Sequence, residues 1–178
     1  AATGAEIYLL NVHAMPIPVA VEGVIVADPS IDRTVRAEES DYLAGTIARV
    51  MAAAPGVKVA GGSIDADEAL ADAISRAART TGSDLVLMAT HGRGAFGRFW
   101  LGSVADDTVA HCPVPVLVLR PGEGPADFAH RPTVGHLLVP LDSTPFAETV
   151  LPHATDLAKA FSAAITLLLV LDGVPDIA

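Results

Sequence analysis

The residues best suited to chemistry lie in a glycine-rich stretch, LVLMATHGRGAFGRFWLGSVADD, which covers residues 85–107. An apolar run typical of a β-strand leads into a glycine loop, and the loop leads into a helix whose first turn carries Gly102 and Ser103. Glycines let the backbone approach a ligand closely, and N–H groups at a helix start attract negative charge. Arg93 and Arg98 make the loop basic within an acidic chain. The pattern predicts a site for an anion such as a phosphate.

Two other interpretations of this stretch stay open. Ser103 and Asp106 have the spacing of a capping box, which would make the glycines part of an ordinary loop before a capped helix. The segment GRGAFG also matches the GxGxxG fingerprint of dinucleotide-binding folds, where the helix opens within the glycines and a later strand ends in Asp or Glu. Here the helix is expected five residues after the last glycine of that segment, and the next strand ends at Arg120. That alternative would be an NADP-dependent oxidoreductase.

The rest of the sequence offers no catalytic centre. No nucleophile stands beside a base, no carboxylate pair is recognisable, and no Walker lysine is present. The histidines lack metal-ligand spacing, so we expect no metal site. His91 fits either a phosphate contact or a local backbone contact. We therefore expect a binding protein and assign no catalytic residue.

Composition narrows the class of protein. The chain has 178 residues, 51% of them hydrophobic, and a net charge of -10, which argues against a nucleic-acid surface or an anionic membrane patch. The longest apolar stretch, residues 160–171, is too short to span a bilayer. Cys112 is the single cysteine, which indicates a reducing compartment. No secretion signal is recognisable, so we expect a cytoplasmic protein without membrane or nucleic-acid partners.

Short apolar runs alternate with longer segments of helical period, which is typical of a parallel α/β sheet with helices on both faces. The expected strands are Ile7–His13, Val57–Gly61, Leu85–Ala89, Val114–Leu119, Leu137–Leu141 and Ile165–Leu171. The expected helices are residues 35–54, 66–77, Ser103–His111 and 145–161. The first has Tyr42 and Met51 on its buried face, and the second is capped by Asp65 and Glu68 and ends at Gly82. The last is expected to bury Phe146, Val150, Leu157 and Phe161.

An internal repeat changes the domain picture. AEIYLLNV (residues 5–12) and AAITLLLV (residues 163–170) agree at five of eight positions. Chance similarity between buried strands is the alternative explanation. A strand and a helix precede the second copy, whereas almost nothing precedes the first. We therefore expect the chain to begin after the first strand and helix of one copy and to end after the second strand of the next.

At the glycine loop the chain resembles the universal stress protein family. The nucleotide signature of that family is glycine, two residues, glycine, nine residues, glycine, then Ser or Thr. Gly92, Gly102 and Ser103 match it, and Ala89 stands where the first glycine usually stands. HCPVPVLVLRP, LLVPLDSTPFAE and both repeat copies resemble further family segments. The resemblance covers nearly the whole chain.

The resemblance implies a flavodoxin-like, adenine nucleotide alpha hydrolase-like fold with a parallel five-stranded sheet. Residues 1–120 would form one domain that lacks its first strand and helix, 121–133 a linker, and 134–178 the first strand, helix and second strand of a second, tandem copy. The implied ligand is ATP or AMP, with Mg²⁺ as its companion where the phosphates need one. The implied nucleotide-binding residues are Val12, Ala89, His91, Gly92, Arg93, Gly102, Ser103, Val104 and Asp142.

Neither copy is complete, because the copy with the glycine loop lacks its own aspartate and the copy with Asp142 lacks a loop. Residues 134–162 either fold back, so that 137–141 fill the vacant central strand, or belong to a tandem protein of which this chain is a piece. The fourteen residues 120–133 reach up to about 45 Å when extended, enough to cross a domain. The first arrangement would give one site from Val12, the loop and Asp142.

The leading hypothesis is a cytoplasmic nucleotide-binding protein with a regulatory or stress-response role and at most slow ATP hydrolysis. The alternative is a dimerising interaction module of the same fold that binds no nucleotide. Residues 114–119, VPVLVL, form an apolar strand, and the resemblance implies that two such edge strands pair across a homodimer or a tandem interface. Ala89 favours the alternative, whereas Gly102 and Ser103 favour nucleotide binding.

Overall fold

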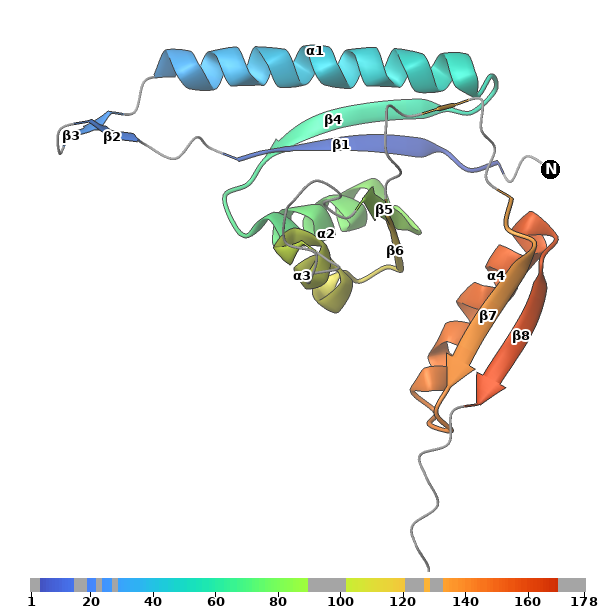
Figure 1. Ribbon diagram of the computed structural model, residues 1–178. Coiled ribbons are helices and arrows are strands. Elements are labelled where there is room, and N and C mark those ends of the chain that lie inside the picture. Colours follow the sequence, from blue (N-terminus) through green and yellow to red (C-terminus); the bar gives the residue numbers. More distant parts are fainter. Residues whose placement is uncertain are drawn as a thin grey trace, which may run out of the picture. The chain divides into compact units, whose positions relative to one another are not determined.

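The computed structural model describes residues 4–14, 19–21, 24–26, 29–89, 102–120, 127–128 and 133–169. The chain divides into two compact units, a larger one of residues 5–127 and a smaller one of residues 1–4 and 128–178. Strands alternate with helices in both units, and the strand pairs that flank helices are parallel (Figure 1). The predicted α/β class is therefore confirmed.

The first half of the larger unit is a parallel strand pair under a long helix. β1 (Ile7–His13) pairs with β4 (Val59–Asp65) over seven residues, and α1 (Pro29–Ala53) packs against both strands (Figure 1). β1 has the predicted bounds. A short antiparallel hairpin, β2 (Val19–Val21) and β3 (Val24–Val26), precedes α1 and was not predicted. Its signal in the sequence is two valine-rich runs separated by two residues that include a glycine.

The inward side of α1 is a narrow stripe. Tyr42 and Met51 were predicted to be buried, but they are 69% and 52% exposed, because α1 covers only two strands and its flanks face outward. The half-buried residues of the helix are Asp32, Val35, Glu39, Leu43, Thr46, Ile47, Val50 and Ala53. The stripe is thus acidic in its first half and mainly apolar in its second.

Small side chains dominate the contact between the next two helices. α2 (Leu70–Thr81) packs on α3 (Ser103–His111) and on β1, and its buried residues are Ala71, Ala73, Ser75, Ala77 and Ala78. Small residues let two helix backbones approach closely. Gly82 ends α2 with a φ of 65°, as its position in the sequence predicted.

The predicted capping box at the start of α2 is wrong. Asp65 is the last residue of β4, and Ala69 is the N-cap residue, with no side-chain cap. Glu68 instead pairs with Arg76, whose Nε lies 2.8 Å from Glu68 Oε1.

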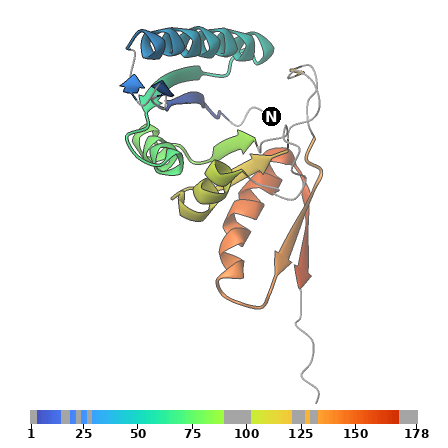
Figure 2. The ribbon, with the colours of Figure 1, turned by 60° about the vertical axis from the view of Figure 1, so that its left-hand side comes forward.

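The second strand pair of the larger unit is exposed on one face. β5 (Val86–Ala89) and β6 (Val116–Leu119) are parallel, with alternating half-buried and exposed residues (Figures 1 and 2). Leu87, Leu117 and Leu119 lie on the exposed face. Burial on both faces, which the apolar runs predicted, is therefore not observed for these strands. Among the described residues the strands occur as two-stranded sheets.

The smaller unit is a strand, helix and strand. β7 (His136–Leu141) and β8 (Ala164–Leu169) are parallel, and α4 (Leu151–Phe161) follows a 3₁₀ turn, η1 (Ala147–Val150) (Figures 1 and 2). Helix α4 buries only Ala154 and Ala158. Phe146, Val150, Leu157 and Phe161 were predicted to be buried but are exposed, since α4 covers two strands only. No helix of the described segments is long and apolar enough to cross a membrane.

Candidate functional site

The start of α3 has the features expected of an anion site. Gly102 is its N-cap residue, in an extended conformation, and no side chain of the described residues caps the helix. The alternative interpretation, a capping box of Ser103 and Asp106, is therefore not observed, since Ser103 is not the N-cap residue. The backbone N–H of Asp106 donates to the Gly102 carbonyl (3.0 Å). The first N–H groups of a helix need acceptors from outside the helix. An anionic ligand is one such acceptor, and the helix dipole favours it.

Packing against α2 positions the first N–H groups of α3. Ala105 and Thr108 are buried, and the Thr108 hydroxyl donates to the Val104 carbonyl (2.6 Å). At the other end, His111 Nδ1 lies 2.9 Å from the Asp107 carbonyl oxygen. Buried small side chains on one face hold the helix against α2, which leaves its first turn, with Ser103 and Val104, in place.

Two further predicted site residues lie at the ends of strands. Val12 is the next-to-last residue of β1, opposite Ile64, and is half-buried. Ala89 is the last residue of β5, opposite Leu119, and is exposed. Ligands of parallel α/β sheets bind at the carboxyl ends of strands, where both residues lie. The predicted residues His91, Gly92 and Arg93 lie outside the described residues.

Asp142 belongs to the smaller unit, where it directly follows β7. Its Oδ1 accepts two hydrogen bonds from Thr144, one from the hydroxyl (2.6 Å) and one from the backbone N–H (3.0 Å). These bonds, the hydroxyl bond first, lower the pKa of the Asp142 carboxyl from its usual value of 3.8. The carboxylate is thus charged at neutral pH and available to accept hydrogen bonds from hydroxyl groups.

A cluster around His13 was not predicted. The His13 side chain is 1% exposed, with Nε2 2.8 Å from Asp32 Oδ1 and Nδ1 2.9 Å from Glu39 Oε2. Arg36 donates to Asp32 Oδ2 (2.8 Å) and to Asp65 Oδ1 (2.7 Å). The signal in the sequence is the pair of acidic residues seven positions apart on the inner stripe of a helix.

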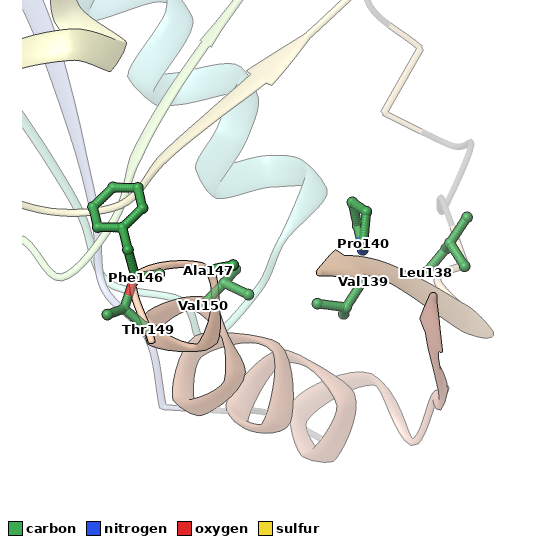
Figure 3. A pocket seen from close by; sticks show the side chains of 7 residues that line it. All are labelled: Leu138, Val139, Pro140, Phe146, Ala147, Thr149 and Val150. Atoms are coloured by element: carbon green, nitrogen blue, oxygen red, sulfur yellow. The ribbon is translucent and has the colours of Figure 1, made fainter. Parts of the chain in front are cut away.

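The smaller unit has an apolar pocket of about 320 Å³ between β7 and the turn η1. Its lining residues are Leu138, Val139, Pro140, Phe146, Ala147, Thr149 and Val150 (Figure 3). The strand residues lie on one side and those of the turn on the other (Figure 3). A lining without charged groups does not suit a phosphate. Within the described segments no group of three or more His, Cys, Asp or Glu residues could hold a metal ion.

Comparison with known proteins identifies a family. A model of the universal stress protein family matches residues 1–120. A candidate universal stress protein of Staphylococcus epidermidis ATCC 35984 is 47% identical over 51 residues, which are 29% of this chain and 31% of the relative. A candidate of Staphylococcus aureus USA300 is 48% identical over 46 residues, 26% and 28% of the two chains. The chain thus covers under a third of these curated relatives.

Two solved structures share the fold. A candidate universal stress protein from Pseudomonas aeruginosa UCBPP-PA14 has a TM-score of 0.54 at 17% identity, over 93% of this chain and 51% of that one. A protein of unknown function from Pseudomonas aeruginosa PAO1 has a TM-score of 0.55 at 17% identity, over 93% and 50%. At this identity the likeness concerns the fold alone, and this chain spans about half of each structure.

Proposed function

The chain belongs to the universal stress protein family, which supports a role in the stress response, and on that premise we propose that it binds ATP or AMP at the start of α3. The uncapped start of that helix carries the proposal. Gly102 has φ and ψ of -70° and 157°, angles that any residue adopts, so the backbone conformation does not require glycine. What glycine contributes at this position is the absence of a side chain. A phosphate can approach the backbone where a Cβ would stand.

The other implied residues have roles that fit their chemistry. Arg93 in the glycine loop supplies positive charge for the phosphates. Val12, at the end of β1, offers backbone groups to the adenine, and the charged Asp142 accepts hydrogen bonds from the ribose. Mg²⁺, where present, is held through the phosphates. We assign no residue to activate water, so the proposed role is regulatory binding in the cytoplasm with at most slow hydrolysis.

We further propose that residues 134–162 complete this site within the same chain. β7 already pairs in parallel with β8, and β8 is the repeat counterpart of β1. The repeat supports the proposal, because a strand that pairs with one copy can exchange that partner for the other copy, and Asp142 directly follows β7.

The test is to identify the bound molecule. Natively purified protein is denatured, and the released small molecule is identified by mass spectrometry. ATP is then titrated into the wild type, Gly102→Asp and the control Gly45→Asp. Asp is as good an N-cap residue as Gly, so Gly102→Asp keeps the helix while its charge repels phosphate. Gly45 is exposed on α1 with open space around it, and it takes the same substitution outside the proposed site.

We expect a nucleotide in about equal amount to the protein and at least a tenfold weaker affinity in Gly102→Asp, about 1.4 kcal/mol of binding free energy. Gly45→Asp should bind as the wild type does. A wild type that carries no nucleotide and does not bind added ATP would overturn the proposal. Tighter binding of NADP than of ATP would favour the dinucleotide alternative.

A second candidate function is that of a dimerising module, and the exposed face of β6 favours it. Leu117 and Leu119 are 41% and 53% exposed on a short strand, and apolar exposure of this kind is typical of an interface. Sedimentation of the wild type and of Leu119→Lys tests it. We expect a dimer that the lysine dissociates. Dimerisation without nucleotide binding would make this the better account of the chain.

A further inference from the structure

We propose that His13, Asp32 and Glu39 form a pH-operated latch, which holds the first half of α1 against the carboxyl ends of β1 and β4. The latch uses none of the proposed nucleotide-binding residues, although His13 directly follows Val12, and it needs no ligand. It is built from one strand residue and two residues of the inward stripe of α1.

The geometry of the ring defines the charge state of the closed latch. Both nitrogens of His13 lie within 2.9 Å of a carboxylate oxygen, Nε2 beside Asp32 and Nδ1 beside Glu39. A carboxylate accepts hydrogen bonds and donates none, so both bonds exist only when both nitrogens carry a proton. The closed latch therefore contains an imidazolium between two carboxylates. In a neutral ring, one nitrogen lone pair would face a carboxylate oxygen at the same short distance.

The groups around the ring reinforce this state. On α1, Arg36 lies between the two acids and bonds Asp32, while from β4 Asp65 accepts the other side of the same guanidinium. From α2, Arg76 pairs with Glu68, and its Nη2 lies 3.5 Å from the Asp65 carbonyl oxygen. Hydrogen bonds to Glu39 and then to Asp32 raise the pKa of His13 above 6.5.

The packing of α1 explains why these bonds matter. The second half of its inner stripe is fixed by Leu43, Ile47 and Val50. The first half presents Asp32 and Glu39 at the corresponding positions, with Val35 between them. Apolar burial thus holds one half of the helix at any pH, whereas the other half depends on charged hydrogen bonds to a buried ring.

The direction of the pH effect follows from the pKa shifts. Because the pKa of His13 is raised in the folded protein, its contribution is complete below about 6.5 and is lost as the pH rises through the raised value. Bonds from Arg36 and then His13 lower the pKa of Asp32 below 3.8, so its contribution is lost as the pH falls through that lowered value. The latch is closed between these limits and opens as the pH rises through the raised pKa of His13.

Hydrogen exchange measured without nucleotide tests the latch apart from the proposed function. Exchange of peptides from residues 29–41 is followed between about pH 5 and pH 9, with α2 peptides as the internal reference for the intrinsic pH effect. In the wild type we expect relative protection to fall at least about tenfold across the range, because two charge-assisted hydrogen bonds are lost. In His13→Gln it should not change with pH. His153→Gln, at an exposed position of α4, is the matched control.

A second variant and a second readout keep the test decisive if His13→Gln does not fold. Glu39→Gln removes one carboxylate and leaves His13 and Asp32 in place, so the midpoint of the pH effect should move to lower pH, because the largest cause of the raised pKa of His13 is lost. The His13 ring, titrated by NMR in the wild type, should have a pKa above 6.5. A lower value, or equal pH dependence of α1 protection in wild type and Glu39→Gln, would overturn the proposal.

Discussion

Gly61 of β4 lies directly opposite Leu9 of β1, so close that a Cβ at Gly61 would stand 2.7 Å from the Leu9 carbonyl oxygen. The same Cβ would stand 3.0 Å from Cδ1 of Ile47 on α1. The backbone oxygen cannot move without disturbing the strand pair. The absence of a side chain at Gly61 is thus a condition for the close packing of α1 on the two strands.

Gly61→Ala should therefore destabilise the larger unit by about 1–3 kcal/mol through overpacking. Its neighbour Gly62 is the matched control. A Cβ there would meet the hydroxyl of Tyr8, the far end of a partly exposed side chain that can swing away. Gly62→Ala should change the free energy of unfolding by less than about 1 kcal/mol. Urea denaturation measures both, and equal losses would contradict the packing argument.

The ends of α2 and α4 offer a second comparison. Gly82 and Ser162 both close their helices with left-handed backbones, at φ of 65° and 56°. In both, the following N–H bonds back to a carbonyl at 2.9 Å, from Ser83 to Ala78 and from Ala163 to Ala158. The motif is the same, but only one of the two helices has the residue that adopts it without strain.

Ser162→Gly should therefore raise the free energy of unfolding of the smaller unit by about 1 kcal/mol, because a left-handed backbone costs about that much for a residue with a Cβ. Ser162→Ala keeps the Cβ and should leave stability nearly unchanged, which separates backbone strain from loss of the hydroxyl. Thermal and urea unfolding give the comparison. An equal gain in the free energy of unfolding from both substitutions would show that the hydroxyl group, and not the left-handed backbone, destabilises the helix end.

The titration of Asp142 reports the turn that holds it. Its pKa should lie below 3.8 in the folded protein. In Thr144→Val it should rise towards that value, because the hydroxyl hydrogen bond, which lowers the pKa most, is lost. Since the pKa is lowered by folding, the contribution of Asp142 to stability is lost as the pH falls through it. Carbon NMR of the carboxyl group measures the shift. Thr149→Val, whose hydroxyl bonds Phe146, should leave it unchanged.

Much of the fold was predictable because it depends on local patterns. β1 and α3 begin and end as predicted, since apolar runs and a glycine before a helix are local signals. The His13 cluster was not, because its partners are 19 and 26 residues away and their meeting depends on how α1 packs. The prediction that Tyr42 is buried was wrong for the same reason, since the helical period does not say how many strands a helix covers.

The candidate site, like the fold, was predictable where it depends on local sequence and not where it depends on long-range contacts. The start of α3 was recognisable from Gly102 and Ser103, although the choice between a capping box and an open helix start needed the structure. Asp142 was recognisable from its place after an apolar strand. Which copy of the chain supplies it to a nucleotide depends on long-range pairing of β7, which no local pattern encodes.

Mixing two defective variants distinguishes the alternatives. Gly102→Asp should lose phosphate binding, and Asp142→Asn should weaken binding by removing the charged acceptor for the ribose. If residues 134–162 complete the site within one chain, every molecule in an equal mixture keeps its own defect, and mixing restores no ATP binding. If a second copy supplied Asp142, half of the random dimers would pair unlike chains. Each such dimer would have one intact site of two, so roughly a quarter of the sites would recover.

We expect no recovery of ATP binding after the two variants are refolded together. ATP titration measures it, and each variant mixed with wild type is the control. Unchanged affinity in Asp142→Asn alone would remove that residue from the proposed site and leave the start of α3 as its centre.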